Sequence, residues 1–163
     1  MLRSGMGPTL SKRSFLTLGL ATPLLAQNAK MPDRGPALEA TLVKDFVVAA
    51  HGSLEKTKLM LEAQPALINA TWDWGGGDFE TALGGASHMG RRDIATLLLE
   101  KGARMDIFAA AMMGKLDIVK AACAAFPGIH KTPGPHKIPL LVHARKGGAE
   151  AEAVLKFLEG ITA

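Results

Sequence analysis

A glycine-centred pattern of small and apolar residues recurs along the chain, and it constrains the fold more than any other feature. The clearest copy surrounds Gly90, with a small pair before it, apolar residues at helical spacing after it, and a closing glycine: Ala86, Ser87, Ile94, Ala95, Leu98, Leu99 and Gly102. The same order surrounds Gly52, Gly114 and Gly147-Gly148. Glycine commonly ends a helix because it adopts the left-handed conformation without a steric penalty. Each copy is therefore predicted to be a pair of short helices.

These predicted hairpins must pack on one another, because a single hairpin cannot bury both of its faces. The apolar stripe of the second helix and the small pair of the first suit close packing between neighbours. Alanine and leucine, which favour helices, are plentiful, and no alternating run of β-branched residues is long enough for a strand. We therefore expect an all-α fold over residues 40–160, interrupted by an extended insertion at the glycine-rich segment Trp74–Asp78.

The segment TALGGASHMGRRDIATLLLEKGA resembles the ankyrin repeat, in which T-P-L-H-x-A-A precedes glycine and I-V, L-L and G-A follow it. The resemblance covers about residues 40–160 and implies an ankyrin-type solenoid of about four helical hairpins. The glycines are separated by 38, 24 and about 33 residues, so we expect the short second interval to lack the usual β-turn. The histidine of the T-P-L-H element is absent from all four copies. Another kind of α-hairpin array is the alternative.

The resemblance implies a non-catalytic module that binds another protein. In that family the two positions before each turn glycine face the partner, and tryptophan and methionine are favoured on binding surfaces. The candidate partner-binding residues combine these positions with the aromatic insertion: Trp72, Trp74, Phe79, His88, Met89, Met112, Met113 and Arg145. Two alternatives stay open, namely that the tryptophans cover the side of the stack and that the methionines belong to the core.

No catalytic residue, metal ligand or cofactor is predicted from sequence motifs. The chain has no H-E-x-x-H motif and no phosphate-binding loop, and the acids Asp73, Asp78, Glu80 and Asp93 are expected to be solvated or to cap helices. The alternative function is a metal-binding protein or enzyme that uses His130, His136 and His143. Their spacing matches no zinc pattern, so we expect solvated histidines in a turn, with His143 packed in the last hairpin.

The N-terminal segment has the layout of an export signal. A basic start is followed by an apolar run from Phe15 to Ala26 and then by small residues. Residues 1–29 are predicted to be removed, by cleavage after Ala26 or Ala29, and residues 30–39 to form a linker. Lys12 stands where a twin-arginine signal has its first arginine, so both the Tat and Sec routes stay open. The mature protein is expected to be periplasmic or secreted and to lack a membrane span; an unprocessed tail on a cytosolic protein is the alternative.

The charge of the chain gives little reason to expect nucleic-acid binding. The net charge is +4, but residues 1–26 contain three basic residues and no acid, which leaves 16 basic and 15 acidic residues in the remainder. A nearly neutral domain lacks the basic surface that attracts phosphate backbones. The single cysteine, Cys123, excludes an intramolecular disulfide and is expected to be a buried, inert thiol.

Overall fold

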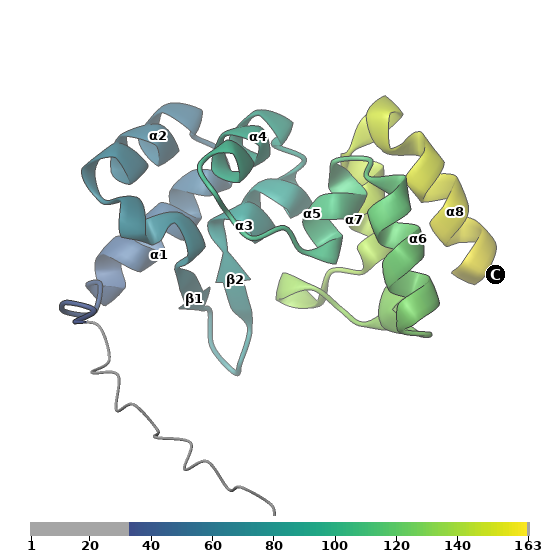
Figure 1. Ribbon diagram of the computed structural model, residues 1–163, viewed down its shortest axis with the longest axis horizontal. Coiled ribbons are helices and arrows are strands. Elements are labelled where there is room, and N and C mark those ends of the chain that lie inside the picture. Colours follow the sequence, from purple (N-terminus) through teal and green to yellow (C-terminus); the bar gives the residue numbers. More distant parts are fainter. Residues whose placement is uncertain (1–32, 163) are drawn as a thin grey trace, which may run out of the picture. The chain divides into compact units, whose positions relative to one another are not determined.

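Helices arranged in consecutive pairs build most of the structure (Figure 1). The computed structural model describes residues 33–162, and this part of the chain contains eight α-helices, four short 3₁₀ helices and two strands. In chain order they are α1 (Ala40–Ala50), α2 (Leu54–Ala63), η1 (Pro65–Asn69), β1 (Thr71–Asp73), β2 (Phe79–Thr81), α3 (Ala82–Met89), α4 (Arg92–Glu100), α5 (Ile107–Met112), α6 (Leu116–Ala125), η2 (Ile129–Lys131), η3 (Pro135–Lys137), α7 (Leu140–Lys146), η4 (Gly148–Ala151) and α8 (Glu152–Thr162).

The helices contact one another within pairs and between pairs. Each odd-numbered helix packs on the even-numbered helix that follows it, and α1, α3, α5 and α7 also contact one another in succession (Figure 1). Helix α2 contacts α4, and α6 contacts α8. The predominance of helix agrees with the all-α prediction.

Several helices end at or near glycines and begin at capping side chains, as the sequence indicates. Gly90 ends α3 with a left-handed backbone (φ 72°), and Gly102 and Gly114 also have positive φ angles, 94° and 73°. At the other end of α3, the Thr81 hydroxyl accepts a hydrogen bond from the amide of Gly84 (3.0 Å), which satisfies a free N–H of the first turn. The Asp106 carboxylate does the same for Ala109 at the start of α5 (2.7 Å).

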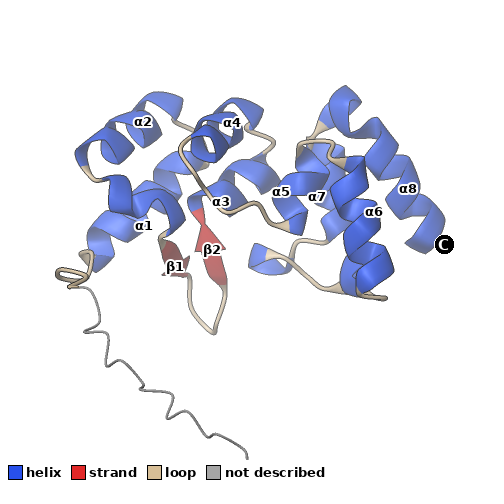
Figure 2. Cartoon of the chain, in the orientation of Figure 1, coloured by secondary structure: helices blue, strands red, loops and turns tan. Residues whose placement is uncertain are grey.

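The insertion after η1 is an antiparallel hairpin, shown in red in Figure 2. Trp72 of β1 lies opposite Glu80 of β2, and three glycines with positive φ angles, Gly75–Gly77, form the turn. The expected extended insertion is thus present. Its two short strands were not part of the all-α prediction. Between α4 and α5 the chain forms no strand.

Two groups of buried side chains make up the core. The first joins α1–α4 with Ala109 and Met112 of α5, and the second joins α5–α8. Ile94, Ala95 and Leu98 of α4 are completely buried, which confirms the apolar stripe expected for this helix. The small pair Ala86 and Ser87 is buried as well, so α3 approaches its neighbours closely.

Residues 36–162 form one compact unit. The predicted export signal, with its cleavage after Ala26 or Ala29, lies outside the described residues. Within residues 33–162, no helix has both the length and the apolar character that crossing a membrane requires.

Candidate metal centre

Four side chains from four different segments converge beneath the row of odd-numbered helices. His51 follows the last turn of α1, Glu80 lies in β2, His88 in α3 and His136 in η3. One donor atom from each side chain can be chosen so that all four atoms lie within 4.8 Å of one another. The segments come together because α1 packs on α3, while the hairpin and the connection between α6 and α7 lie beside these helices.

The distances between the donor atoms are short and similar. His51 Nε2 lies 3.1 Å from His88 Nε2 and 3.3 Å from Glu80 Oε2. His136 Nε2 is 3.3 Å from the same carboxylate oxygen, and His88 Nε2 is 2.9 Å from Glu80 Oε1. The donor atoms therefore surround a common point rather than pairing off in separate contacts.

Two adjacent glycines of α3 create the space for these side chains. A Cβ atom on Gly85 would lie 2.7 Å and 2.8 Å from atoms of the His51 ring, and a Cβ on Gly84 would lie 3.3 Å from Glu80 Cγ. Glycine inside a helix costs roughly 0.5–1 kcal/mol relative to alanine. The glycine pair thus weakens α3 locally. In return, the His51 imidazole and the Glu80 side chain can lie directly against the backbone of α3.

Outer partners fix the orientation of two of the histidines. His51 Nδ1 lies 2.8 Å from the carbonyl oxygen of Val47, which can only accept, so Nδ1 donates and Nε2 is directed at the cluster. His136 Nδ1 lies 2.8 Å from Asp78 Oδ2, which leaves its Nε2 directed inward in the same way. Histidines that ligate metals generally carry such a carbonyl or carboxylate partner on the second nitrogen.

The carboxylate of Glu80 is the most buried group of the cluster. The residue is 1% exposed, and Oε2 accepts a hydrogen bond from the indole N–H of Trp74 (2.8 Å). Oε1 has no hydrogen bond of acceptable geometry despite its distance of 2.9 Å from His88 Nε2. A buried carboxylate with one unsatisfied oxygen needs a compensating positive charge.

The histidines supply part of that charge when no metal is bound. Burial opposes ionisation of Glu80, but the close imidazoles of His51 and His88 outweigh it and hold the pKa of this carboxyl well below its usual range. The hydrogen bond to Glu80 in turn raises the pKa of His51, against the opposing effect of burial. The cluster is thus an ionised carboxylate surrounded by imidazole nitrogens that stabilise its negative charge.

The hairpin residues predicted to bind a partner are divided between the surface and this cluster. Phe79 is 61% exposed, whereas Trp74 is partly exposed and hydrogen-bonded to Glu80. Trp72 is half-buried, with the ammonium of Lys44 at 5.7 Å from its ring centre. The two tryptophans are therefore not equivalent, because only Trp74 contacts the cluster.

The pre-glycine residues also differ from one another. Met89 is 48% exposed, and Arg145 is exposed with its guanidinium 3.6 Å from Glu159 Oε1. His88 belongs to the cluster, and Met113 is half-buried against the core. Met112 is completely buried, so its expected place on a partner-binding surface is wrong. Its side chain packs in the first group of core residues, together with residues of α1–α4.

Sequence reasoning also missed two members of the cluster. Glu80 was expected to be solvated or to cap a helix, but it is buried at the centre of the site. His51 was considered only as a pre-glycine residue. The detectable signals were the histidines at pre-glycine positions of two adjacent helical pairs and the Gly84-Gly85 pair between Glu80 and His88.

The histidine-rich segment 130–143 contributes one residue to the cluster. His136 joins it, whereas His143 is buried in α7 as predicted, and the ring of His130 lies elsewhere. Burial lowers the pKa of His143 to about 4, and both of its ring nitrogens lack a hydrogen-bond partner among the described residues. Of the three histidines considered for the metal-binding alternative, only His136 therefore lies in the cluster.

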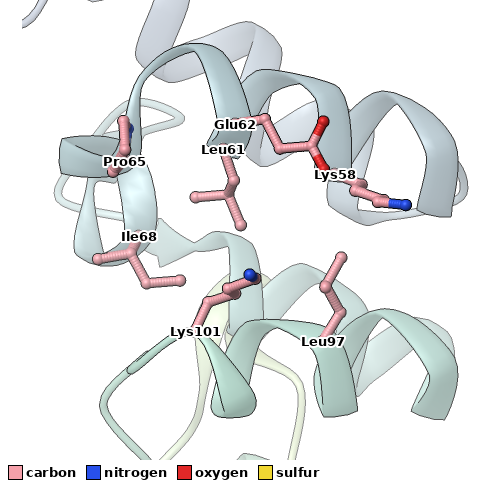
Figure 3. A pocket seen from close by; sticks show the side chains of 7 residues that line it. All are labelled: Lys58, Leu61, Glu62, Pro65, Ile68, Leu97 and Lys101. Atoms are coloured by element: carbon pink, nitrogen blue, oxygen red, sulfur yellow. The ribbon is translucent and has the colours of Figure 1, made fainter.

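A separate pocket of about 280 Å³ lies between α2, η1 and α4 (Figure 3). Its floor is apolar, with Leu61, Ile68 and Leu97, and Lys58 and Lys101 lie at its edge. It shares no residue with the cluster, and no group of metal-ligating side chains converges there among the described residues. The histidine cluster is thus the better candidate for a functional site.

Comparison of the chain with protein-family models, with curated proteins and with solved structures finds no match.

Proposed function

We propose that this protein binds one divalent transition-metal ion through His51, Glu80, His88 and His136. The observation that carries the proposal is the convergence of four donor atoms from four separate segments to within 4.8 Å of one another. Random surface clusters of histidine and acid lack the oriented rings and the buried carboxylate found here. The outer partners and the glycine cradle are further features of a built site.

Zinc is the ion that fits this donor set best. Zinc–nitrogen and zinc–oxygen bonds are ~2.0–2.1 Å long, so the ligand atoms of a tetrahedral site are separated by about 3.3 Å. Four of the separations between donor atoms in the cluster range from 2.9 Å to 3.3 Å, and one donor atom from each side chain lies within 4.8 Å of the other three. Imidazole also suits copper and nickel, whereas calcium and magnesium prefer all-oxygen sites. A site with three imidazoles therefore selects against calcium and magnesium.

The site is proposed to hold the metal rather than to use it for catalysis. Structural zinc sites have four protein ligands, whereas catalytic sites have three and keep a position open for water. His51, Glu80, His88 and His136 together fill a tetrahedral shell. The protein is accordingly proposed to be non-catalytic, in agreement with the expectation from the sequence.

The helical pairs are proposed to be four ankyrin-type repeats. Support comes from the glycine-centred pattern, from the left-handed glycines that end helices, and from the successive contacts of the odd-numbered helices. In such an array the metal would join the first two repeats to the connection that precedes the fourth. Export to the periplasm or beyond the cell is proposed on the sequence of residues 1–29 alone.

Binding of another protein is a second candidate function. The specific observation is that Phe79 and Met89 remain 61% and 48% exposed, although both are apolar and close in sequence to the cluster. Exposed apolar side chains of this size can anchor a partner. A pull-down from the envelope fraction with the wild-type protein and with Phe79→Ser would test this function, and equal recovery of the partner would contradict it.

The metal-binding proposal is tested by metal analysis of the purified full chain. After treatment with a chelator and dialysis against Zn²⁺, the wild-type protein should retain one zinc ion per chain. Glu80→Gln removes the buried charge with little change in shape and should abolish retention, whereas Glu159→Gln alters an exposed acid and should not. Retention by Glu80→Gln equal to that of the wild type would contradict the proposal.

A further inference from the structure

We infer that the metal ion acts as a clamp that docks the connection between α6 and α7, residues 127–139, onto the β1–β2 hairpin. The inference rests on the proposed zinc site and concerns what the site controls. Removal of the metal would release this connection while the helical pairs stay folded. The metal would thus switch one face of the protein between a closed and an open form.

The connection has few other attachments to the rest of the protein. None of its residues is buried, and its hydrogen bonds from backbone to backbone within the described chain are local ones, such as Gly134 N–H to Ile138 and Lys137 N–H to Gly134. By contrast, α7 begins at the completely buried Leu140. Segments with little buried surface and few long-range hydrogen bonds open at low free-energy cost.

His136 provides the polar links from this connection to the hairpin. Its backbone N–H donates to Asp78 Oδ1 (2.8 Å), its Nδ1 lies 2.8 Å from Asp78 Oδ2, and its Nε2 lies 3.3 Å from Glu80 Oε2. The ring also lies 5.6 Å from that of Trp74, centre to centre. One side chain, which is also a proposed ligand, therefore carries the attachment.

The backbone at this attachment is held in an unfavourable conformation. His136 and Lys137 have φ angles of 57° and 59°, in the left-handed region that residues other than glycine rarely adopt. Such conformations persist when surrounding interactions enforce them. A metal–nitrogen bond to His136 would supply such an interaction, and its loss would favour relaxation of the connection.

The closed form leaves a cleft between the connection and the hairpin turn. The cleft has a volume of about 540 Å³ and is bordered by Gly75, Gly76, Gly77, Asp78, Pro133, Gly134, His136 and Lys137. Gly134 also covers the ring of Phe108, since a Cβ at this position would lie 2.9 Å from it. Release of the connection would widen this cleft and expose Phe108.

Limited proteolysis of the full chain tests the clamp directly. Lys131 and Lys137 are exposed trypsin sites within the connection, and Lys101 is an exposed site outside it. At a free zinc concentration of about ten times Kd, zinc should slow cleavage at Lys131 and Lys137 about tenfold, because a ligand that binds only the closed form lowers the open population by a factor of 1 + [Zn²⁺]/Kd. Cleavage at Lys101, followed by mass spectrometry in the same digest, should not change.

The matched control is His136→Asn, because asparagine tolerates the left-handed backbone but removes the imidazole. This variant keeps three proposed ligands, so zinc at saturating concentration should bind it without protecting Lys131 or Lys137. If the wild-type protein binds zinc and both sites are cleaved at unchanged rates, the clamp is wrong and the metal site stands. If no zinc binds, the proposed function itself has failed.

Discussion

His51 Nε2 lies 3.1 Å from His88 Nε2, although the two histidines are separated by 37 residues and belong to different helical pairs. His51 donates through Nδ1 to Val47, and both facing nitrogens are also within 3.3 Å of the Glu80 carboxylate. Two imidazole nitrogens at this distance must share either a proton or a metal ion. Binding of the proposed metal ion would therefore displace the proton that the two histidines share.

Zinc binding is expected to release protons, because ligating imidazoles must be neutral and the hydrogen bond to Glu80 raises the pKa of His51. As the pH falls through the raised pKa of His51, the proton competes better and the zinc affinity should decrease. Calorimetric titrations in buffers of different ionisation enthalpy measure the released protons. An observed enthalpy independent of the buffer would contradict this mechanism.

Gly85→Ala should weaken zinc binding at least about tenfold, as expected when the orientation of a ligand is disturbed. The new Cβ would lie 2.7 Å from the His51 ring and force it to move. Alanine itself favours the helix by roughly 1 kcal/mol, so the loss should not come from unfolding. Gly160→Ala is the matched control, because a Cβ there has no neighbour within 4 Å. Equal zinc affinity of both variants would show that the cradle is unimportant.

Leu98→Ala should lower the free energy of unfolding by about 2–5 kcal/mol, since it removes buried methyl groups and leaves a cavity. Leu98 is completely buried in the first core, whereas Leu59 of α2 is 62% exposed. Leu59→Ala should therefore change the stability little. Urea unfolding of both variants provides the comparison, and a neutral Leu98→Ala would mean that the helical register is wrong.

The stability of the metal-free protein should depend on His143 between about pH 4 and 6.5. Burial lowers the pKa of His143 to about 4, from 6.5 in the unfolded chain. The unfolded state therefore binds more protons in this interval, and the stability falls as the pH decreases. From pH 7.5 to 4.5, wild type should lose roughly 2–3 kcal/mol more than His143→Leu, at ~1.4 kcal/mol per pKa unit. Parallel pH profiles would contradict this assignment.

The sequence predicted the helical pairs because local chemistry determines them. Gly90 adopts the left-handed conformation, and Ile94 and Leu98 are buried, as helical spacing around a terminal glycine requires. Met112 was placed on the surface by analogy with its position before Gly114. That error arose because burial at this position depends on how α5 packs on the core of α1–α4, which no local pattern encodes.

The candidate site was not predictable to the same degree. Its ligands are 29, 8 and 48 residues apart along the chain, and no short motif contains more than two of them. Their proximity depends on how α1 packs on α3 and on where the connection with His136 lies. The sequence did place His51 and His88 at equivalent pre-glycine positions, which was a usable indication that they would be close.

The most direct test of the account is a competition titration of the chelator-treated full chain with Zn²⁺ against a chromophoric chelator. The wild-type protein and His130→Ala should each bind one zinc ion with the same affinity, because His130 lies outside the cluster. His88→Ala should bind zinc at least about a hundredfold more weakly, since it lacks a direct ligand. Failure of the wild type to compete for zinc, or equal weakening by the two substitutions, would contradict the proposed metal site.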